Sequence, residues 1–181
     1  KAGLYFGLEL SRVRSIHLVT IDADLTAAQL DTIQREVFTN PVTQISAYTP
    51  LDIDFDWTIW VGYRPGVRDN PGSTAMEAVE DILSLKLDAG AAIYTSRRYC
   101  VKGSGLCEDD LETIAGELLA NKIIQQWKIY AADQWDADTG IGYIIPKVRL
   151  DHIPTVATIP VASDRALEEI SKQRNLALNP N

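Results

Sequence analysis

Few side chains in this sequence stand at the spacings that chemistry requires. Cys100 or Cys107 could act as a nucleophile only beside a histidine, and the two histidines, His17 and His152, lie in no recognisable motif. Zinc needs three or four ligands at suitable spacing, and the sequence offers none. The stretch DADTG opens like a calcium loop, but Lys147 occupies the twelfth position, where glutamate is required. This chain by itself is therefore predicted to be non-catalytic, with no catalytic residue, no metal ligand and no cofactor of its own.

The loop YRPGVRDNPG, residues 63–72, is the best candidate for a phosphate site. It combines Arg64 and Arg68 with glycines, and a predicted helix begins just after it. It lacks the Gly-Lys-Ser/Thr ending of a nucleotide-binding P-loop. We therefore favour a strand-to-helix connection whose arginines lie in solvent or in ion pairs. The second glycine-rich stretch, KGSG at 102–105, is too short for a nucleotide motif and is expected to be a plain turn.

Two adjacent arginines, Arg97 and Arg98, lie in the stretch SRRYC on a predicted strand. Neighbouring strand residues face opposite sides of a sheet, so the two cannot both be in the core. A solvated face is the favoured interpretation, and a place for one of them at an interface is the alternative. Together with Tyr99, Arg64 and Arg68 they are the candidates for contacting a partner.

The elements that would position these residues occur in two similar series. DTIQREVFTNPVTQ at 31–44 is matched by ETIAGELLANKIIQ at 112–125, with residue n over residue n+81. The same offset places Leu25 over Leu106 and Ser15 over Ser96. A period of this length is too long for a solenoid repeat and fits a small duplicated domain.

In the first series, a β-branched run at 13–21 predicts a strand. Thr26 and Gln29 predict a capping box at the start of an amphipathic helix. Asn40 is expected to end that helix in the left-handed conformation, before a proline that cannot continue it. A second strand is predicted over 42–48.

The second series predicts the same order: a strand at 93–102, a helix ended by a left-handed Asn121, and a strand at 123–130. An extra pair precedes it, made of an alternating strand at 57–63 and a helix with a capping box at Thr74. The complete unit is therefore β-α-β-α-β, or the same unit with its long central strand folded into a hairpin.

These patterns predict an α+β fold in which an antiparallel sheet carries its helices on one face. The expected organisation is a partial first repeat at 1–50, a complete second repeat at 54–132, and an extended linker at 133–181. That linker is expected to wrap a surface over 134–160 and to end in the start of a helix at 163–178. The matched apolar stripes of the two repeat helices predict that the repeats pack against each other as a pseudo-dimer, with Arg64, Arg68 and Arg98 on the outer surface.

The composition narrows the class of partner. The formal net charge is −8, which argues against nucleic acid and anionic membranes. No run of 18 apolar residues is present, so no membrane span is expected. Two cysteines fit a reducing cytoplasm better than a disulfide framework.

Three stretches carry a family resemblance: FDWTIWVGYRPGVRDNPGSTAMEAVEDIL, AIYTSRRYCVKG and LLANKIIQQWKIY. Together they resemble the PurS-type module of phosphoribosylformylglycinamidine synthase, and more closely the duplicated PurS-like N-terminal region of its large PurL-type chains. The likeness covers 11–131 and is clearest over 56–130. The pair Arg98-Tyr99 resembles the Lys-Tyr of free-standing PurS chains, whereas the first repeat has no counterpart of RPGVRDN.

The resemblance implies a role in purine biosynthesis. The synthase uses ATP, magnesium and glutamine to amidate formylglycinamide ribonucleotide, as a carbon–nitrogen ligase. The module would bridge its synthetase and glutaminase parts, in one chain or between chains, and support ammonia transfer. This implies a fragment of a longer enzyme, and allows a homodimer. A tandem ferredoxin-like module of the ACT type, which would bind a small ligand between its repeats, is the alternative.

Overall fold

The computed structural model describes residues 3, 6–148 and 163–174. The chain divides into two compact units, one up to Val148 and one from Arg149, and each is described by itself. The elements of the first unit, in chain order, are β1 (Leu10–Asp22), α2 (Ala27–Ile33), η1 (Gln34–Phe38), β2 (Trp57–Tyr63), α3 (Asn70–Leu83), β3 (Ala92–Gly103), α4 (Glu108–Ile114), η2 (Ala115–Leu119), β4 (Gln125–Ala131) and η3 (Ala132–Gln134).

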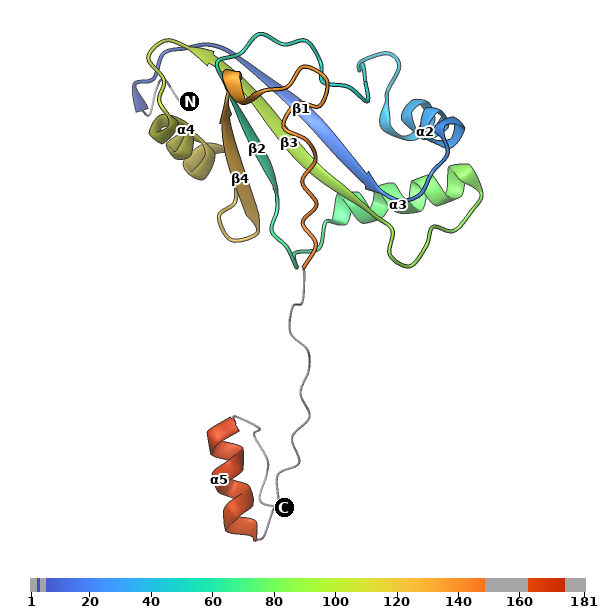
Figure 1. Ribbon diagram of the computed structural model, residues 1–181, viewed down its shortest axis with the longest axis vertical. Helices are drawn as coiled ribbons and strands as arrows, with labels where there is room; N and C mark the ends of the chain where they lie inside the picture. Colours follow the sequence, from blue (N-terminus) through green and yellow to red (C-terminus); the bar gives the residue numbers. More distant parts are fainter. Residues whose placement is uncertain (1–2, 4–5, 149–162, 175–181) are drawn as a thin grey trace. The chain divides into compact units, whose positions relative to one another are not determined.

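The first unit is an α+β structure built on one four-stranded antiparallel sheet, as Figure 1 shows. The strand order is β1-β3-β2-β4, so the two longest strands, β1 and β3, pair along almost their whole length. The strands predicted at 13–21, 57–63 and 93–102 are confirmed, each within a residue or three of its bounds. The predicted fold class is thus confirmed at this level.

Helices α2 with η1, α3, and α4 with η2 cover the same face of the sheet, in two separate groups. Helix α4 and η2 pack with Ile59 and Val101 in one core cluster. Helices α2 and α3 pack with Ile93 in the other. These strand residues have odd numbers and therefore point to one side of the sheet. Figure 1 shows α4 beside one end of the sheet and α2 with α3 beside the other.

The matched apolar stripes of the two repeat helices pack in separate core clusters. Ile33 of the first stripe is fully buried against Val79 of α3 and Ile93 of β3. Ile114 of the second stripe packs in the other cluster, with residues of β2 and β3. The first repeat therefore completes its core with a helix and a strand that belong to the second repeat. The two repeats share their core through this exchange, and through the pairing of β1 with β3.

Local signals explain where the helices begin. The predicted capping box of α2 is present, because Thr26 Oγ1 accepts from Gln29 N at 3.3 Å and Gln29 Oε1 accepts from Thr26 N at 2.8 Å. The predicted box at Thr74 is wrong, because helix α3 is capped five residues earlier. Its N-cap is Asp69, whose Oδ1 accepts from Gly72 N at 2.8 Å. Proline in the first turn suits that start, since its missing N–H would have no partner there.

The two helices of the repeats end alike, but not as predicted. Each widens into a π-helical turn of five residues, η1 or η2, and then becomes extended at Thr39 or Ala120. Neither Asn40 nor Asn121 has a positive φ; among the described residues other than glycine, Ser84 at the end of α3 is the one that does. The left-handed ending expected at both asparagines is therefore wrong.

Both asparagines instead start the same turn. Asn40 Oδ1 accepts from Val42 N at 2.9 Å, and Asn121 Oδ1 accepts from Ile123 N at 3.0 Å. A glutamine four residues on then accepts from the asparagine N–H, at 2.9 Å in the first repeat and 2.8 Å in the second. This is a side-chain turn that needs no left-handed backbone.

The strand predicted at 42–48 is also wrong. This segment follows its turn without regular structure, and its residues are exposed. Its counterpart is β4, which pairs with β2. Among the described residues the first repeat provides no strand equivalent to β2, so the segment has no described neighbour with which to form a ladder. The predicted closing strand at 123–130 is confirmed, as β4.

In the strands we infer an offset between the repeats one smaller than in the helices, so that residue n lies over residue n+80. Ile21 and Val101 both point to the helix-bearing face and enter the core clusters. Lys102, which the helix offset would place over Ile21, points to the other face. A slip of one residue reverses every side chain of a strand. The match of Ser15 with Ser96 is therefore not structural, and the second repeat has one extra residue in its strand-to-helix turn.

The second unit contributes helix α5 (Asp164–Arg174) among the described residues. The helix predicted at 163–178 is thus confirmed over most of its length, and its last four positions lie outside the described residues. The linker predicted from 134 is without regular structure up to 148, apart from the end of η3 and a bridge between Asp136 and Gly140. Positions 149–160 of that linker lie outside the described residues.

Candidate partner-binding surfaces

The four candidate arginines lie in different surroundings. Arg64, at the end of β2, donates from Nε to Gln125 O at 2.9 Å and from a terminal nitrogen to Lys122 O at 3.1 Å. It therefore ties β2 to the turn before β4, although it remains exposed. Arg68 is exposed on the loop before α3, and Arg97 is exposed on the helix-bearing face. Arg98 is buried, so its predicted place on the outer surface is wrong.

Arg97 and Arg98 do point to opposite faces of the sheet. Arg97 lies opposite His17 of β1, between the two helix groups. Tyr99, two residues on, is half-buried in the cluster beneath α4. Arg98 alone of the candidates is on the face without helices. The five residues proposed for partner contact therefore do not form one patch.

The guanidinium of Arg98 lies beneath an aromatic ring. Its Cζ is 4.4 Å from the ring centroid of Trp135, and the edge of Phe55 meets Trp135 with 5.3 Å between centroids. Arg98 is 6% exposed and its Nε has no hydrogen-bond partner, nor does any carboxylate in the described part of the chain pair with it. Burial lowers the pKa of Arg98, against a smaller opposing effect of Cys100. Stacking on an aromatic face suits arginine in such a site.

The segment from η3 to Val148 covers this face of the sheet. Its first anchor is Trp135 on Arg98, and its last is Lys147, which forms an ion pair with Asp22 and donates to Gly90 O at 3.3 Å. In Figure 1 this segment, in orange, crosses the sheet. These two contacts hold this part of the linker against the sheet, in the way that the expected wrapping of a surface requires. In the sequence the two contacts are visible only as one tryptophan and one lysine in a loop.

Beneath the segment the sheet is buried and mostly uncharged. Thr58, Trp60 and Cys100 are each less than a tenth exposed, and Trp60 Nε1 donates to Ser96 Oγ at 3.0 Å. Burial raises the pKa of the Cys100 thiol. A buried thiol whose pKa is raised is a weak nucleophile. This face therefore has the character of a structural layer.

The loop at 63–72 does not offer a free helix N-terminus to phosphate. The Asp69 carboxylate occupies the start of α3 and also accepts from Thr95 N and Thr95 Oγ1, at 2.5 and 2.9 Å. An anion would have to compete with this carboxylate for the same N–H groups. The structure therefore agrees with the interpretation of this loop as a connection. The other glycine-rich stretch, KGSG, begins at the opposite end of β3.

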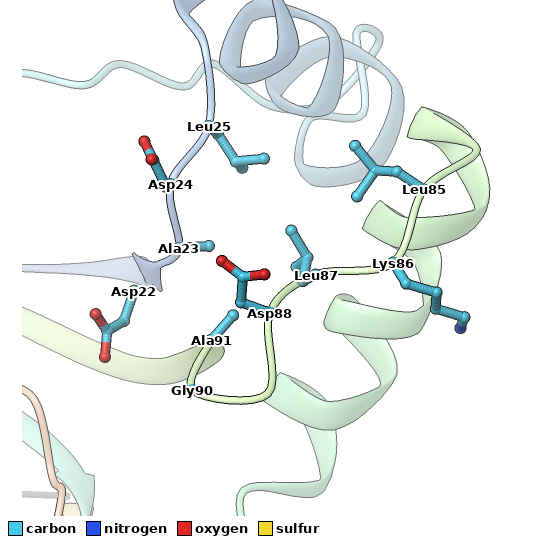
Figure 2. A pocket seen from close by; sticks show the side chains of 10 residues that line it. All are labelled: Asp22, Ala23, Asp24, Leu25, Leu85, Lys86, Leu87, Asp88, Gly90 and Ala91. Carbon is cyan, nitrogen blue, oxygen red and sulfur yellow. The ribbon is translucent and has the colours of Figure 1, made fainter.

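A pocket lies between the end of β1 and the connection from α3 to β3, as Figure 2 shows. Its volume is about 400 Å³. Leu25, Leu85 and Leu87 converge on it, with the carboxylate of Asp88 beside them, while Lys86 points away. Lys86 is paired with Glu80 at 2.5 Å. The lining therefore combines apolar side chains with negative charge, a poor setting for a phosphorylated ligand.

The described residues contain no group of three or more histidine, cysteine, aspartate or glutamate side chains placed to hold a metal ion. Cys107 is exposed, and its thiol donates to Asp110 Oδ2 at 3.2 Å. Within the described part of the chain, no helix is long and apolar enough to cross a membrane. A comparison with protein-family models gave no match, and a search of curated proteins likewise gave none.

Proposed function

We propose that this chain is an N-terminal structural and assembly module of phosphoribosylformylglycinamidine synthase. In this role it bridges the synthetase and glutaminase parts and supports the transfer of ammonia between them. Synthetase and glutaminase residues, with ATP and magnesium, perform the chemistry, and the module lies in the cytoplasm. The resemblance over 56–130 is the origin of this proposal.

One observation supports it most. The two repeats join by antiparallel pairing of equivalent strands, β1 and β3, with His17 opposite Arg97 at the centre. Because residue n of β1 corresponds to residue n+80 of β3, His17 and Arg97 are also equivalent positions. The pairing is therefore close to a two-fold relation, as two separate chains of a symmetric dimer would have. This arrangement fits a duplicated PurS-type unit and supports the pseudo-dimer hypothesis.

The distribution of charge is consistent with a bridging role. Arg68 and Arg97 are exposed, and no ion pair joins either of them to an acidic side chain in the described part of the chain. Arg68 lies on the loop before α3, and Arg97 lies within β3. Exposed arginines are enriched where proteins meet.

The test is reconstitution with the two catalytic parts. A synthetase and a glutaminase that lack this region are assayed for amidation of formylglycinamide ribonucleotide, with glutamine or with ammonium as nitrogen donor. Adding the chain should raise the glutamine-dependent rate while the ammonium-dependent rate changes little. Arg68→Glu and Arg97→Glu should weaken the effect. Arg35→Glu is the matched control, because Arg35 already pairs with Asp31 on its own helix at 3.0 Å.

Failure of the chain to bind either part, or an equal effect on both nitrogen donors, would contradict the proposal. Thermal shift with amino acids and nucleotides tests the ACT-type alternative in the same preparation. A specific ligand at a hundredfold excess over its Kd should stabilise the fold by about 2.7 kcal/mol.

A further inference from the structure

Strand β1 is 13 residues long and has a neighbour on one side only among the described strands. It pairs with β3, and none of the other described strands pairs with its outer edge. Its middle is well exposed on the helix-bearing side, where Val13 and Val19 are 50% and 38% exposed. A long edge with apolar side chains is a ready template for a further strand.

The direction of the backbone N–H and C=O groups identifies which residues of β1 are available to pair with a further strand. On β3, Thr95 N is bound by Asp69, Val101 O accepts from Asp56 N, and Gly103 N is bound by Asp56. These odd-numbered groups point toward β2, so the even-numbered groups of β3 point toward β1. Opposed residues of an antiparallel pair direct their groups alike. The even-numbered residues of β1 thus bond to β3, and the odd-numbered ones present their N–H and C=O groups outward.

The near two-fold relation shows what covers the equivalent edge. With the strand offset of n+80, the outer edge of β1 corresponds to the edge of β3 that β2 occupies. Val13 corresponds to Ile93, which is 4% exposed because α2 and α3 pack on it. Val13 is 50% exposed, and no helix among the described residues packs on it in this way. The surroundings of Val13 and of Ile93 thus differ by one β-strand and one helix. In the second repeat these two elements are β2 and α3.

The segment at 42–48 is independent evidence for a missing strand beside β1. It begins with the same asparagine–glutamine turn as the approach to β4, and it carries the exposed apolar side chains Val42, Ile45 and Tyr48. In the second repeat the corresponding strand pairs with β2. A strand beside β1 would supply the missing neighbour.

We propose that the outer edge of β1 is a docking site for a β-strand followed by an amphipathic helix, equivalent to β2 and α3. The strand runs antiparallel to β1, with the equivalent of Ile59 opposite Val19 and the equivalent of Val61 opposite His17. These positions follow from the pairing of Ile59 with Tyr99 and of Val61 with Arg97. The helix covers Val13.

The chemistry of the occupant follows from β2 and α3 themselves. The strand needs apolar residues at alternate positions toward the helix layer, as β2 has Ile59 and Val61. The helix needs an apolar stripe, as α3 has in Met76, Val79 and Leu83. Main-chain bonds provide affinity in such strand addition, and the alternate side chains set the register.

The experiment supplies that unit and reads single amides of β1. A duplicate of residues 54–83 is joined before Lys1, and hydrogen exchange is followed by NMR in the original and extended chains. In the original chain the amides of Ile16 and Leu18 should be protected, and those of Ser15 and His17 should exchange fast. In the extended chain the latter two should slow by roughly a hundredfold, toward the protection of paired strands.

Controls separate strand addition from general stabilisation. Ser15→Pro removes an outward N–H and should abolish the slowing at His17 in the extended chain, while Ile16 and Leu18 keep their protection. The same 54–83 segment, added as a separate peptide to the original chain, should also slow Ser15 and His17. Fast exchange at both residues with both forms of the segment would overturn the proposal. So would slow exchange in the original chain that depends on its concentration, since a second molecule of the protein would then occupy the edge.

Discussion

The turns at 40–44 and 121–125 are almost identical, yet only one of them leads into a strand. In each, the asparagine side chain binds the N–H two residues on, and the glutamine N–H binds the asparagine C=O at 2.9 or 2.8 Å. After the second turn the chain forms β4 beside β2. After the first turn it has no partner and no ladder among the described residues. A turn is satisfied by its own few residues, whereas a strand needs a neighbour to take up its backbone groups.

The same contrast applies to whole repeats. The first repeat has a helix and an edge strand that resemble those of the second, but it borrows α3 and part of β3 to bury Ile33. The second repeat buries Ile114 mainly with its own strands, and Leu8 and Leu10 of the first repeat pack against the same cluster. We therefore expect the two repeats to depend on each other for stability, and to unfold as one body.

The largest test of this expectation truncates the equivalent core residues. Ile33→Ala and Ile114→Ala each remove most of a side chain that is no more than 4% exposed. Each should lower the free energy of unfolding by about 2–5 kcal/mol, because a cavity is left in a packed core. Urea denaturation should show one transition for residues up to 148 in both variants. Two separate unfolding transitions, of which the substitution shifts only one, would contradict a shared core.

A smaller effect is expected where α3 is fastened to β3, a connection that the first repeat lacks. Asp69→Ala removes both the helix cap and the bonds to Thr95, and should cost roughly 2 kcal/mol. Thr74→Ala is the control and should be nearly neutral, since α3 has already begun at Asn70. Equal losses of the free energy of unfolding in the two variants, measured by urea denaturation, would show that Asp69 is not the N-cap of α3.

The asparagine turns should contribute less, and unequally. Asn121→Ala should cost about 1 kcal/mol because the turn N–H loses its side-chain acceptor. Asn40→Ala should cost less, since its turn leads to no ladder. Asn121→Asp keeps an acceptor at the same place and should retain most of the stability in urea denaturation, whereas Asn121→Gly should not. If Asn121→Gly is as stable as the original chain, the left-handed ending would be favoured after all.

The smallest effect concerns acid stability. A hydrogen bond from Lys86 lowers the pKa of Glu80, with a second contribution from Leu87 N at 3.0 Å. A carboxyl whose pKa is lower in the folded state adds stability above its unfolded pKa, near 4.5, and loses it as pH falls through the folded pKa. Glu80→Gln should therefore reduce stability at neutral pH and flatten its fall below pH 4.5 in thermal melts. An unchanged fall of the melting temperature below pH 4.5 would show that Glu80 has no such role.

Periodicity and capping signals predicted much of this fold. Alternation over 57–63 identified β2, and Thr26 with Gln29 identified the start of α2, because these signals act within a few residues. The strand at 42–48 was wrong, since its composition is suitable but its neighbour is missing. The repeat offset was right for the helices and one residue out for the strands, because an extra turn residue is invisible to a match of residue types.

The candidate surfaces were harder to predict. That Arg97 and Arg98 face opposite sides follows from strand geometry alone, and is confirmed. Which of them is buried depends on Trp135, which is distant from Arg98 in the sequence and reaches it by way of a segment without regular structure. No local sequence pattern predicts such a contact. The same holds for the ion pair that joins Lys147 to Asp22.

Cross-linking at the centre of the β1–β3 pair tests the account most directly. His17 and Arg97 are opposed and do not bond through their backbones, the geometry in which Cα atoms approach to about 4.5 Å. In a Cys107→Ser background, His17→Cys with Arg97→Cys should form a disulfide on mild oxidation and raise the melting temperature. The pair His17→Cys with Thr95→Cys, one step away on the same face, should form it poorly. Efficient cross-linking of the second pair, with none in the first, would contradict the pairing of equivalent strands on which the whole account depends.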